Sequence, residues 1–530
     1  MRLRSFARCC GGVGQAASLP MRWHGGIRPQ YHMRRSLAGC ATRSTRTGEL
    51  MRMSALHLYN TLTRRKQPFE PAEANTVRMY TCGPTVYDVV HVGNLRTFLF
   101  YDVLRRALQY KGFQMKHVMN ITDVDDKTIN GALQAGVPLP EYTAKYTEVF
   151  LADLEPMRVE PPEHLVRATE HIPQMIELTK TLLEKGHAYE SGGSVYFNIA
   201  SFPGYGKLSG KRPGTLSVSE THARIESDEY KDDVADFALW KAAKPDEPTW
   251  DSPWGPGRPG WFIECSVMAM THLGETIDIH SGGTDLIFPH HENEIAQSEA
   301  ATGKPFARFW VHPGFLLLNG QKISKSLGNI IVLKELLDDG HDPAAIRLAL
   351  IATAHYRTQF NFTVESVKDA ARGLGRIHDF MDRLEEALAA ASADTEAAEE
   401  SSLTAALAEA ERNFDAAIDD DLNLPQALSH VFDLMRGANS AMADATAARS
   451  ELEQTRALMR KFDRIFAVFE HEKGTVDAEI EAKIRERDEA RKERDFARAD
   501  QIRDELASAG IVLEDGPMGT RWRRVGSGPA

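Results

Sequence analysis

The chain has 530 residues and a mass of 59.0 kDa, and its 63 basic and 75 acidic side chains give a formal net charge of −12. An apolar content of 42% supports a hydrophobic core, and a chain of this length should contain several domains, so disorder throughout is excluded. The sequence has no apolar run long enough to cross a membrane, and its pI of about 5.9 argues against a nucleic-acid binder that works by bulk positive charge.

Residues 1–53 differ from the rest of the chain in charge. They contain ten arginines and one acidic residue, Glu49, so their net charge is +9, and the remaining 53 basic and 74 acidic groups give the body −21. Such a leader is typical of a mitochondrial transit peptide. An over-called translation start, with Met53 as a sensible first residue, competes and is slightly favoured because the leader lacks one clear amphipathic period. We therefore expect a cytoplasmic protein, or a mitochondrial matrix protein if the leader is genuine.

The first ordered part of the body has the pattern of a strand, a helix and a second strand. The first strand stops at Gly83, Asn94 can cap the helix, and Gly112 ends it. We expect a strand over residues 77–82, a helix from Asn94 to about Tyr110, and a strand over residues 114–122. A strand–helix–strand unit indicates a parallel sheet.

The remaining sequence predicts an insertion and then a helical region. Residues 140–240 mix helix-like and turn-rich pieces, and residues 244–261 combine proline and glycine with three tryptophans, which favours an ordered loop. The expected elements are a strand over 276–280, a helix that begins with Pro289, helices over 365–470 with a linker at 392–402, a charged helix over 477–508, and a basic C-terminal stretch around Trp522.

The motif His91-Val92-Gly93-Asn94 lies where the first strand gives way to the helix. A helix N-terminus presents free backbone N–H groups and the positive end of the helix dipole to an anion. Gly93 allows a ligand to approach the backbone, and His91 can donate a hydrogen bond to a phosphate oxygen. Alone, these residues are more often an ordinary loop than a phosphate site.

A second motif, Lys322-Ile323-Ser324-Lys325-Ser326, places two ammonium groups on one loop. Such groups suit a triphosphate whose charge redistributes during reaction. A solvated basic loop explains most Lys-Ser stretches, but the upstream His-x-Gly-Asn motif makes a nucleotide site the better explanation.

A third set of residues has the chemistry of metal ligands. Only two cysteines occur after the leader, which indicates a reducing compartment and no disulfide scaffold. His290 and Glu294 are spaced i,i+4 and would share a helix face, and thiolate, imidazole and carboxylate groups all bind zinc. Buried structural cysteines and a polar helix are the alternative. The candidate ligands are Cys82, Cys265, His290, His291, Glu292 and Glu294.

Together these segments resemble the class I aminoacyl-tRNA synthetases, and closely the bacterial-type cysteinyl-tRNA synthetase family, from about Leu56 to Arg524. His91–Asn94 and Lys322–Ser326 are similar to the two class-wide motifs, HIGH and KMSKS. More specific likenesses occur in residues 80–87 (YTCGPTVY), 120–126 (NITDVDD), 257–266 (GRPGWFIECS) and 280–294 (HSGGTDLIFPHHENE). The departures are small: Asn94 replaces the last histidine of HIGH, Ile323 replaces methionine, and Phe262 stands where the family commonly has histidine.

The resemblance implies a role for each candidate residue. Cys82, Cys265, His290 and Glu294 would hold one Zn²⁺, and Thr122, Trp261 and Asp285 would line the pocket for the amino acid and adenylate. His91, Asn94, Lys322 and Lys325 would be catalytic, and His91, Gly93, Lys322, Ser324 and Lys325 would bind ATP, which enters with Mg²⁺.

The resemblance also implies the reaction and the domain order. L-cysteine would be activated by ATP and transferred to tRNA(Cys) by a monomer that needs no membrane, with zinc selecting the thiol. A Rossmann-type α/β catalytic domain with an insertion around 140–240 would span residues 54–345, a stem and α-helical bundle 346–470, and a small anticodon-binding region 471–530. A cysteine ligase acting on an amino sugar, or a non-catalytic tRNA-binding paralogue, remains an alternative.

Overall fold

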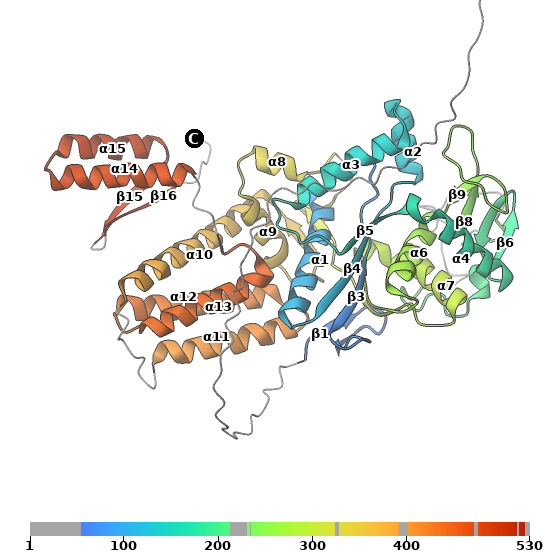
Figure 1. The fold of residues 1–530 in the computed structure, drawn as a ribbon, viewed down its shortest axis with the longest axis horizontal. Coiled ribbons are helices and arrows are strands. Elements are labelled where there is room, and N and C mark those ends of the chain that lie inside the picture. The colour runs from blue at the N-terminus through green and yellow to red at the C-terminus, as the bar shows by residue number, and fades with distance from the viewer. Residues whose placement is uncertain are drawn as a thin grey trace, which may run out of the picture. The chain divides into compact units, whose positions relative to one another are not determined.

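The computed structural model describes residues 55–211, 231–233, 235–323, 328–391, 401–470, 475–516 and 519–524, and the predicted leader lies outside them. Its central feature is a five-stranded parallel sheet (Figure 1). The strand order is β11 (Ala307–Val311), β10 (Ile277–Ser281), β3 (Thr76–Thr81), β4 (Gln114–Ile121) and β5 (His164–Arg167). The chain adds β4 and β5 on one side of β3 and later adds β10 and β11 on the other. This doubly wound arrangement confirms the predicted Rossmann-type sheet.

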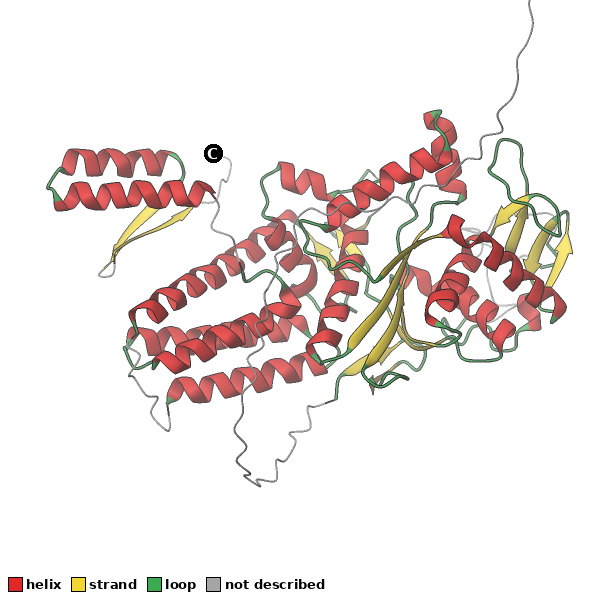
Figure 2. Cartoon of the chain, viewed as in Figure 1, coloured by secondary structure: helices red, strands yellow, loops and turns green. Residues whose placement is uncertain are grey.

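Side chains of the central strands alternate between two apolar cores. Met79 and Met119 belong to one core with α1 (Val92–Tyr110), whereas Tyr80 and Val118 belong to the other with α6 (Trp261–Leu273). Because successive strand residues point to opposite faces, each face needs its own helical cover. Helices α1 and α6 accordingly lie on opposite faces of the sheet (Figures 1 and 2).

Two predicted helix starts are wrong. His91, not Asn94, is the N-cap of α1, and the two residues exchange side-chain bonds with each other's backbone N–H. Pro289 lies in a separate turn, Ile287–His291, and α7 (Glu292–Thr302) begins only after it. The C-terminal end of α1 agrees with the prediction, since the helix ends at Tyr110 and Gly112 has a φ of 92°.

The inserted part contains a four-stranded antiparallel sheet that the sequence did not predict. Its strands are β6 (Ala188–Ser191), β7 (Ser194–Phe197), β8 (Phe237–Ala242) and β9 (Gly257–Pro259). The helices before it are α2 (Asp126–Ala135), α3 (Leu139–Leu154) and α4 (Ile172–Glu184). The inserted part thus extends past residue 240 and leads back to the central parallel sheet through α6.

A small sheet follows β11 and leads into the helical region. Its strands are β12 (Leu316–Leu318), β13 (Gln321–Lys322) and β14 (Phe360–Phe362), with α8 (Leu333–Asp338) and α9 (Pro343–Ala352) between the last two. The predicted helices over 365–470 are present as α10 (Val364–Ala390), α11 (Ser402–Asp419), α12 (Leu424–Ala443) and α13 (Arg449–Phe466). Residues 392–400 of the expected linker lie outside the described part. A hairpin of β1 (His57–Asn60) and β2 (Arg65–Pro68) precedes the main sheet.

The C-terminal part pairs two helices with a hairpin. The charged segment expected as one helix is two, α14 (Thr475–Lys492) and α15 (Phe496–Ser508), followed by β15 (Ile511–Gly516) and β16 (Gly519–Arg524). Ile480, Ile484, Ile502 and Leu506 form its own small core. Within the described residues, no helix is both long and apolar enough to traverse a bilayer.

Candidate active site

The candidate site lies where the strand order reverses, between β3 and β10. Cys82 directly follows β3, and its backbone N–H donates to the carbonyl oxygen of Ser281 at the end of β10 (3.0 Å). Thr122 directly follows β4, and its backbone exchanges hydrogen bonds with Pro84 and Val86 of the first loop. In open α/β sheets, ligands bind outside the carboxyl ends of the strands at this reversal.

Four side chains that the resemblance named as zinc ligands converge there. The donor atoms of Cys82, Cys265, His290 and Glu294 all lie within 4.8 Å of one another, and all four residues are buried. The two Sγ atoms are 4.0 Å apart, and His290 Nε2 is 3.4 Å from Cys265 Sγ and 3.2 Å from Glu294 Oε1. A tetrahedral zinc ion with bonds of about 2.0–2.3 Å separates its ligand atoms by roughly 3.3–3.8 Å. The donor set therefore fits such an ion.

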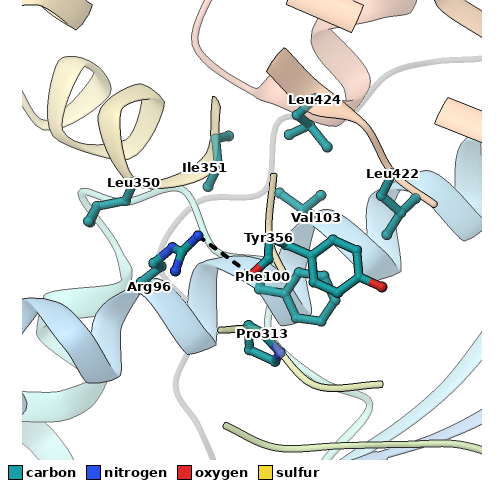
Figure 3. Close-up of a pocket in the computed structure, with 9 residues that line it drawn as sticks. All are labelled: Arg96, Phe100, Val103, Pro313, Leu350, Ile351, Tyr356, Leu422 and Leu424. Carbon is teal, nitrogen blue, oxygen red and sulfur yellow. Dashed lines mark hydrogen bonds between the residues drawn. The ribbon is translucent and has the colours of Figure 1, made fainter. Parts of the chain in front are cut away.

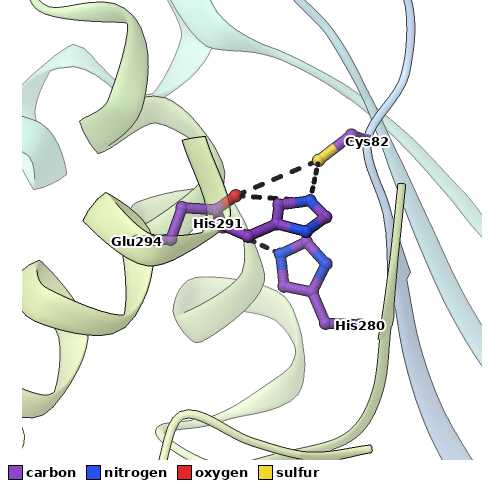
Figure 4. Close-up of side chains that lie close together, drawn as sticks. All are labelled: Cys82, His280, His291 and Glu294. Atoms are coloured by element: carbon purple, nitrogen blue, oxygen red, sulfur yellow. Dashed lines mark hydrogen bonds and ion pairs between the residues drawn. The ribbon is translucent and has the colours of Figure 1, made fainter. Parts of the chain in front are cut away.

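A second, overlapping set shares Cys82 and Glu294 but uses His280 and His291 (Figure 4). His280 Nε2 is 2.8 Å from Glu294 Oε2, and His291 Nε2 is 3.3 Å from Cys82 Sγ. His291 Nδ1 is in turn 2.8 Å from Nε2 of His312. The first set favours zinc more strongly because it contains both thiols, whereas His280 holds the outer oxygen of Glu294, as an orienting partner of a ligand does.

Burial favours the neutral forms of both thiols, of Glu294 and of His280, as the direction of each pKa shift shows. It raises the pKa of both thiols and raises the pKa of Glu294 to about 8. It also lowers the pKa of His280 to about 3. A bound cation would reverse the preference of the thiols and the carboxyl group, because the charged forms would then be stabilised by attraction to the metal.

The wall beside the cluster is made by Thr122 and two residues that the sequence did not single out. Thr122 Oγ1 donates to Glu264 Oε2 (2.9 Å) and accepts a hydrogen bond from Asn120 Nδ2 (3.1 Å). All three side chains are buried. Since the one hydroxyl proton of Thr122 is bound to Glu264, the oxygen presents only a lone pair to a ligand.

Trp261 and Asp285 form the more accessible edge of the site. Trp261 begins α6, and its ring centroid is 4.3 Å from that of His290. Asp285 is exposed and lies over Gly283, where a Cβ atom would come within 2.4 Å of its Oδ1. Phe262 is buried and packs edge-on against Phe237, so it contributes an apolar contact behind this edge.

The predicted phosphate motif, His91–Asn94, lies at the N-terminus of α1, where hydrogen bonds hold the His91 ring in place. His91 Nδ1 accepts from the backbone N–H of Asn94 (3.2 Å), so the proton of the neutral ring is on Nε2. A Cβ atom on Gly93 would lie 3.0 Å from the His91 ring and 3.2 Å from Cδ1 of Ile323. Glycine is thus needed for the ring and the second motif to approach the helix together.

The second motif lies against the first. Lys322 ends β13, Ile323 faces Gly93, and the backbone N–H of Val92 donates to Ile331 beyond the motif (2.9 Å). The residues on either side of the loop, Ile323 and Ile331, therefore both contact the first turn of α1. The predicted ATP-binding residues Ser324 and Lys325 lie outside the described residues.

A buried arginine binds the chain segments that lead into β12 and β14. Arg96 of α1 donates to five backbone carbonyl oxygens, those of Gly314, Phe315, His355, Tyr356 and Thr358. It borders a hollow of about 10 Å³ together with Tyr356 and Leu422. Figure 3 draws the residues that line this hollow. Beside Leu422, Asp421 accepts hydrogen bonds from Tyr356 Oη, Arg357 Nε and the backbone of Tyr59. The turn before α12 is thereby bound to the segment that carries β14.

Sequence comparisons place the chain among synthetases. Residues 68–372 match the family described as tRNA synthetases class I (C) catalytic domain, residues 413–470 the DALR domain, and residues 474–523 the cysteinyl-tRNA ligase anticodon binding domain. A cysteine–tRNA ligase of Solibacter usitatus is 50% identical over 474 residues, covering 89% of this chain and all of that one. One of Geobacillus thermodenitrificans is 45% identical over 475 residues, with the same coverage.

Solved structures agree at the level of the fold. Mycobacterium tuberculosis methionyl-tRNA synthetase in complex with methionyl-adenylate superposes with a TM-score of 0.55 at 16% identity, over 74% of this chain and 90% of that one. The doubly wound sheet and the two adjoining motifs thus define a class I aminoacyl-tRNA synthetase fold. Within that class, the sequence matches show that the chain belongs to the cysteine–tRNA ligase family.

Proposed function

We propose that the protein ligates L-cysteine to tRNA(Cys) with ATP, in two steps through cysteinyl-adenylate. The observation that carries this proposal is the buried cluster of two thiols, an imidazole and a carboxylate at the strand reversal, beside a helix N-terminus suited to phosphate. The family membership supports the same reaction.

Zinc is the metal that this donor set favours. Cys82, Cys265, His290 and Glu294 would hold it, and when bound it would supply a soft Lewis acid that prefers the thiolate of cysteine to the hydroxyl of serine. His280 orients Glu294 through its outer oxygen. Ligand chemistry of this kind discriminates where pocket size alone gives only a small preference.

The other residues of the wall orient the amino acid. Thr122, whose hydroxyl donates its hydrogen bond to Glu264, offers a lone pair that suits the substrate ammonium group. Trp261 and Asp285 close the accessible edge. An amino acid held between these groups presents its carboxylate to a nucleotide at α1, and such positioning is the main requirement of an in-line displacement at phosphorus.

The nucleotide would bind at the two motifs as ATP with Mg²⁺. His91 donates from Nε2 to a phosphate oxygen, Gly93 leaves room for that approach, and Asn94 keeps the ring in the required tautomer. Lys322, Ser324 and Lys325 complete the site by their place in the motif, with the two lysines balancing the charge that develops on the phosphates.

The division of the chain follows from these roles. Residues 54–345 form the catalytic domain, 346–470 the stem and helical bundle, and 471–530 the anticodon-binding region. We infer a monomer in the cytoplasm, or in the mitochondrial matrix if residues 1–53 are a transit peptide.

The deciding experiment combines aminoacylation with metal analysis. Wild-type protein should charge tRNA(Cys) with labelled cysteine and contain about one zinc per chain, and Cys265→Ala and Glu294→Gln should lose most of that metal. Glu299→Gln is the matched control, because Glu299 also lies on α7 but bonds Lys207 and the backbone of Phe306. Active enzyme without zinc would contradict the metal assignment. Cysteine transfer to an amino sugar, or no charging at all, would contradict the tRNA assignment.

A further inference from the structure

Three histidine side chains meet at the end of α6 that lies away from the candidate active site. His272 is in the last turn of α6, His164 begins β5, and His171 ends the short 3₁₀ turn Ala168–His171. His272 is seven residues beyond Cys265 on the same helix, which separates their backbones by roughly 10 Å along its axis. The cluster is therefore separate from the four proposed zinc ligands.

The imidazole rings of this cluster pack on one another. The ring centroid of His272 lies 5.1 Å from that of His171 and 5.6 Å from that of His164. His164 and His272 are exposed, whereas His171 is buried. Because two of the three rings are exposed, an ion from the solvent can reach the cluster.

Two ring nitrogens of the cluster face each other. His171 Nε2 is 2.9 Å from His272 Nε2. His171 Nδ1 is 2.8 Å from the carbonyl oxygen of Arg167, and since a carbonyl only accepts, the proton of the neutral ring is on Nδ1 and Nε2 presents its lone pair. A backbone carbonyl that fixes the tautomer and direction of the ring in this way is a common partner of a metal-bound histidine.

The distance between the two nitrogens matches a particular coordination geometry. An ion with bonds of about 2.1 Å separates neighbouring imidazole nitrogens by roughly 3.0 Å at a right angle and by roughly 3.4 Å in a tetrahedron. The observed 2.9 Å favours the right angle. Ni²⁺ and Cu²⁺ prefer right angles between nitrogen ligands, and imidazole suits both ions.

We propose that His171 and His272 form a second metal site, which chelates a divalent transition-metal ion such as Ni²⁺ or Cu²⁺ with His164 as a third ligand. On binding, the proton of His272 moves from Nε2 to Nδ1, so each neutral ring keeps one proton and gives the ion a lone pair. His164 is exposed and can change rotamer to reach the ion.

The ion would join the end of α6 to the segment that follows β5. That segment is already held to the loop after β4, because the backbone N–H and the hydroxyl of Thr169 both donate to the Asp123 carboxylate (3.0 and 2.6 Å). A ligand that binds only the folded arrangement stabilises the folded protein. This second site is independent of the proposed function and takes no part in it.

The test titrates Ni²⁺ into the full chain after one equivalent of Zn²⁺ has filled the first site. Isothermal titration calorimetry should show one bound Ni²⁺ per wild-type chain, and His171→Gln and His272→Gln should each weaken its binding at least about tenfold. His164→Gln should weaken it less. Saturating Ni²⁺ should also raise the midpoint of thermal unfolding of the wild type but not of His272→Gln, whose replaced side chain is exposed and should leave the fold intact.

His187→Gln is the matched control, because the His187 ring also packs on a neighbouring ring, that of Phe197, but its Nδ1 bonds Ser201 Oγ outside the cluster. This variant should bind Ni²⁺ as the wild type does. No bound Ni²⁺ in the wild type, equal affinity in His272→Gln, or a loss that His187→Gln reproduces overturns the proposal. Release of Zn²⁺ in proportion to the Ni²⁺ bound also overturns it, since the added ion would then have entered the first site.

Discussion

Asp421→Ala is the substitution with the largest expected effect away from the site. Asp421 is fully buried, and its carboxylate accepts from the backbone N–H of Tyr59 (2.8 Å), Tyr356 Oη (2.6 Å) and Arg357 Nε (2.6 Å). Its φ of 63° is a further constraint, since aspartate tolerates the left-handed region better than alanine does. Removing the carboxylate leaves two polar groups without their partner and the guanidinium group of Arg357 without its counter-charge.

The magnitude follows from these contacts. Hydrogen bonds to a charged group contribute about 1.5–3 kcal/mol each, but the contribution of Arg357 is discounted because a third of its side chain is exposed. We therefore expect Asp421→Ala to lower the free energy of unfolding by about 3–5 kcal/mol. Asp421→Asn keeps an acceptor and tolerates the positive φ, so it should lose about half as much.

Urea unfolding followed by far-ultraviolet circular dichroism measures both variants against the wild type. Pyrophosphate exchange gives a second readout, because the segment that Asp421 holds also supplies three of the carbonyls bound by Arg96. If both variants unfold within about 0.5 kcal/mol of the wild type, as ordinary surface substitutions do, the turn is not held by this carboxylate and the reasoning is refuted.

Two further substitutions test the site and the sheet. Gly93→Ala should raise the KM for ATP several-fold in pyrophosphate exchange, because the new methyl group would lie 3.0 Å from the His91 ring; an unchanged KM would show that the ring need not stay there. His117 is buried and its pKa is lowered by burial to about 3, so the unfolded chain gains a proton below about pH 6.5 that the folded chain does not. As the pH is lowered through this window, the free energy of unfolding should decrease by up to about 1.4 kcal/mol per pH unit. In His117→Gln this slope should be smaller by the contribution of one bound proton, and equal slopes in the two proteins would place the effect elsewhere.

The central sheet was predictable because its strands follow a simple physical pattern. Residues 77–82 alternate, and a helix with one apolar face joins them across Gly112 to a second strand segment at 114–122, so the parallel pair followed from the sequence. The four-stranded sheet of the insertion was missed. Its strands are short, and β7 pairs with β8 across a long stretch of intervening chain, so no local period marks them.

Helix boundaries were less predictable than helices. The break between α14 and α15 contains neither glycine nor proline, and the positive φ of 62° falls on Arg494, a residue with no marked preference for it. At α1, both His91 and Asn94 can accept a backbone bond, and only the exchange of bonds between them shows which is the cap. Composition does not distinguish the two arrangements.

The site illustrates what spacing can and cannot tell. His290 and Glu294 were placed on one helix face by their i,i+4 spacing, and their side chains do meet at 3.2 Å. The reason differs from the expected one, since α7 begins only at Glu292 and His290 belongs to the preceding turn. The partners His280, His312 and Glu264 come from other elements, so only the fold brings them to the site.

One loop connects Cys82 of the proposed metal site with His91 of the proposed phosphate site. Cys82 directly follows β3 and His91 caps α1, and the connection between them is bound to Thr122, which directly follows β4. In the proposed reaction, a substrate whose thiol lies at Cys82 would have to present its carboxylate near the other end of this loop, at the positive pole of α1. Changing the length of this loop would separate the thiol site from the phosphate site without altering either one. Cysteine binding and metal content should then survive while adenylate formation is lost, since the reaction depends on holding the two reactants together.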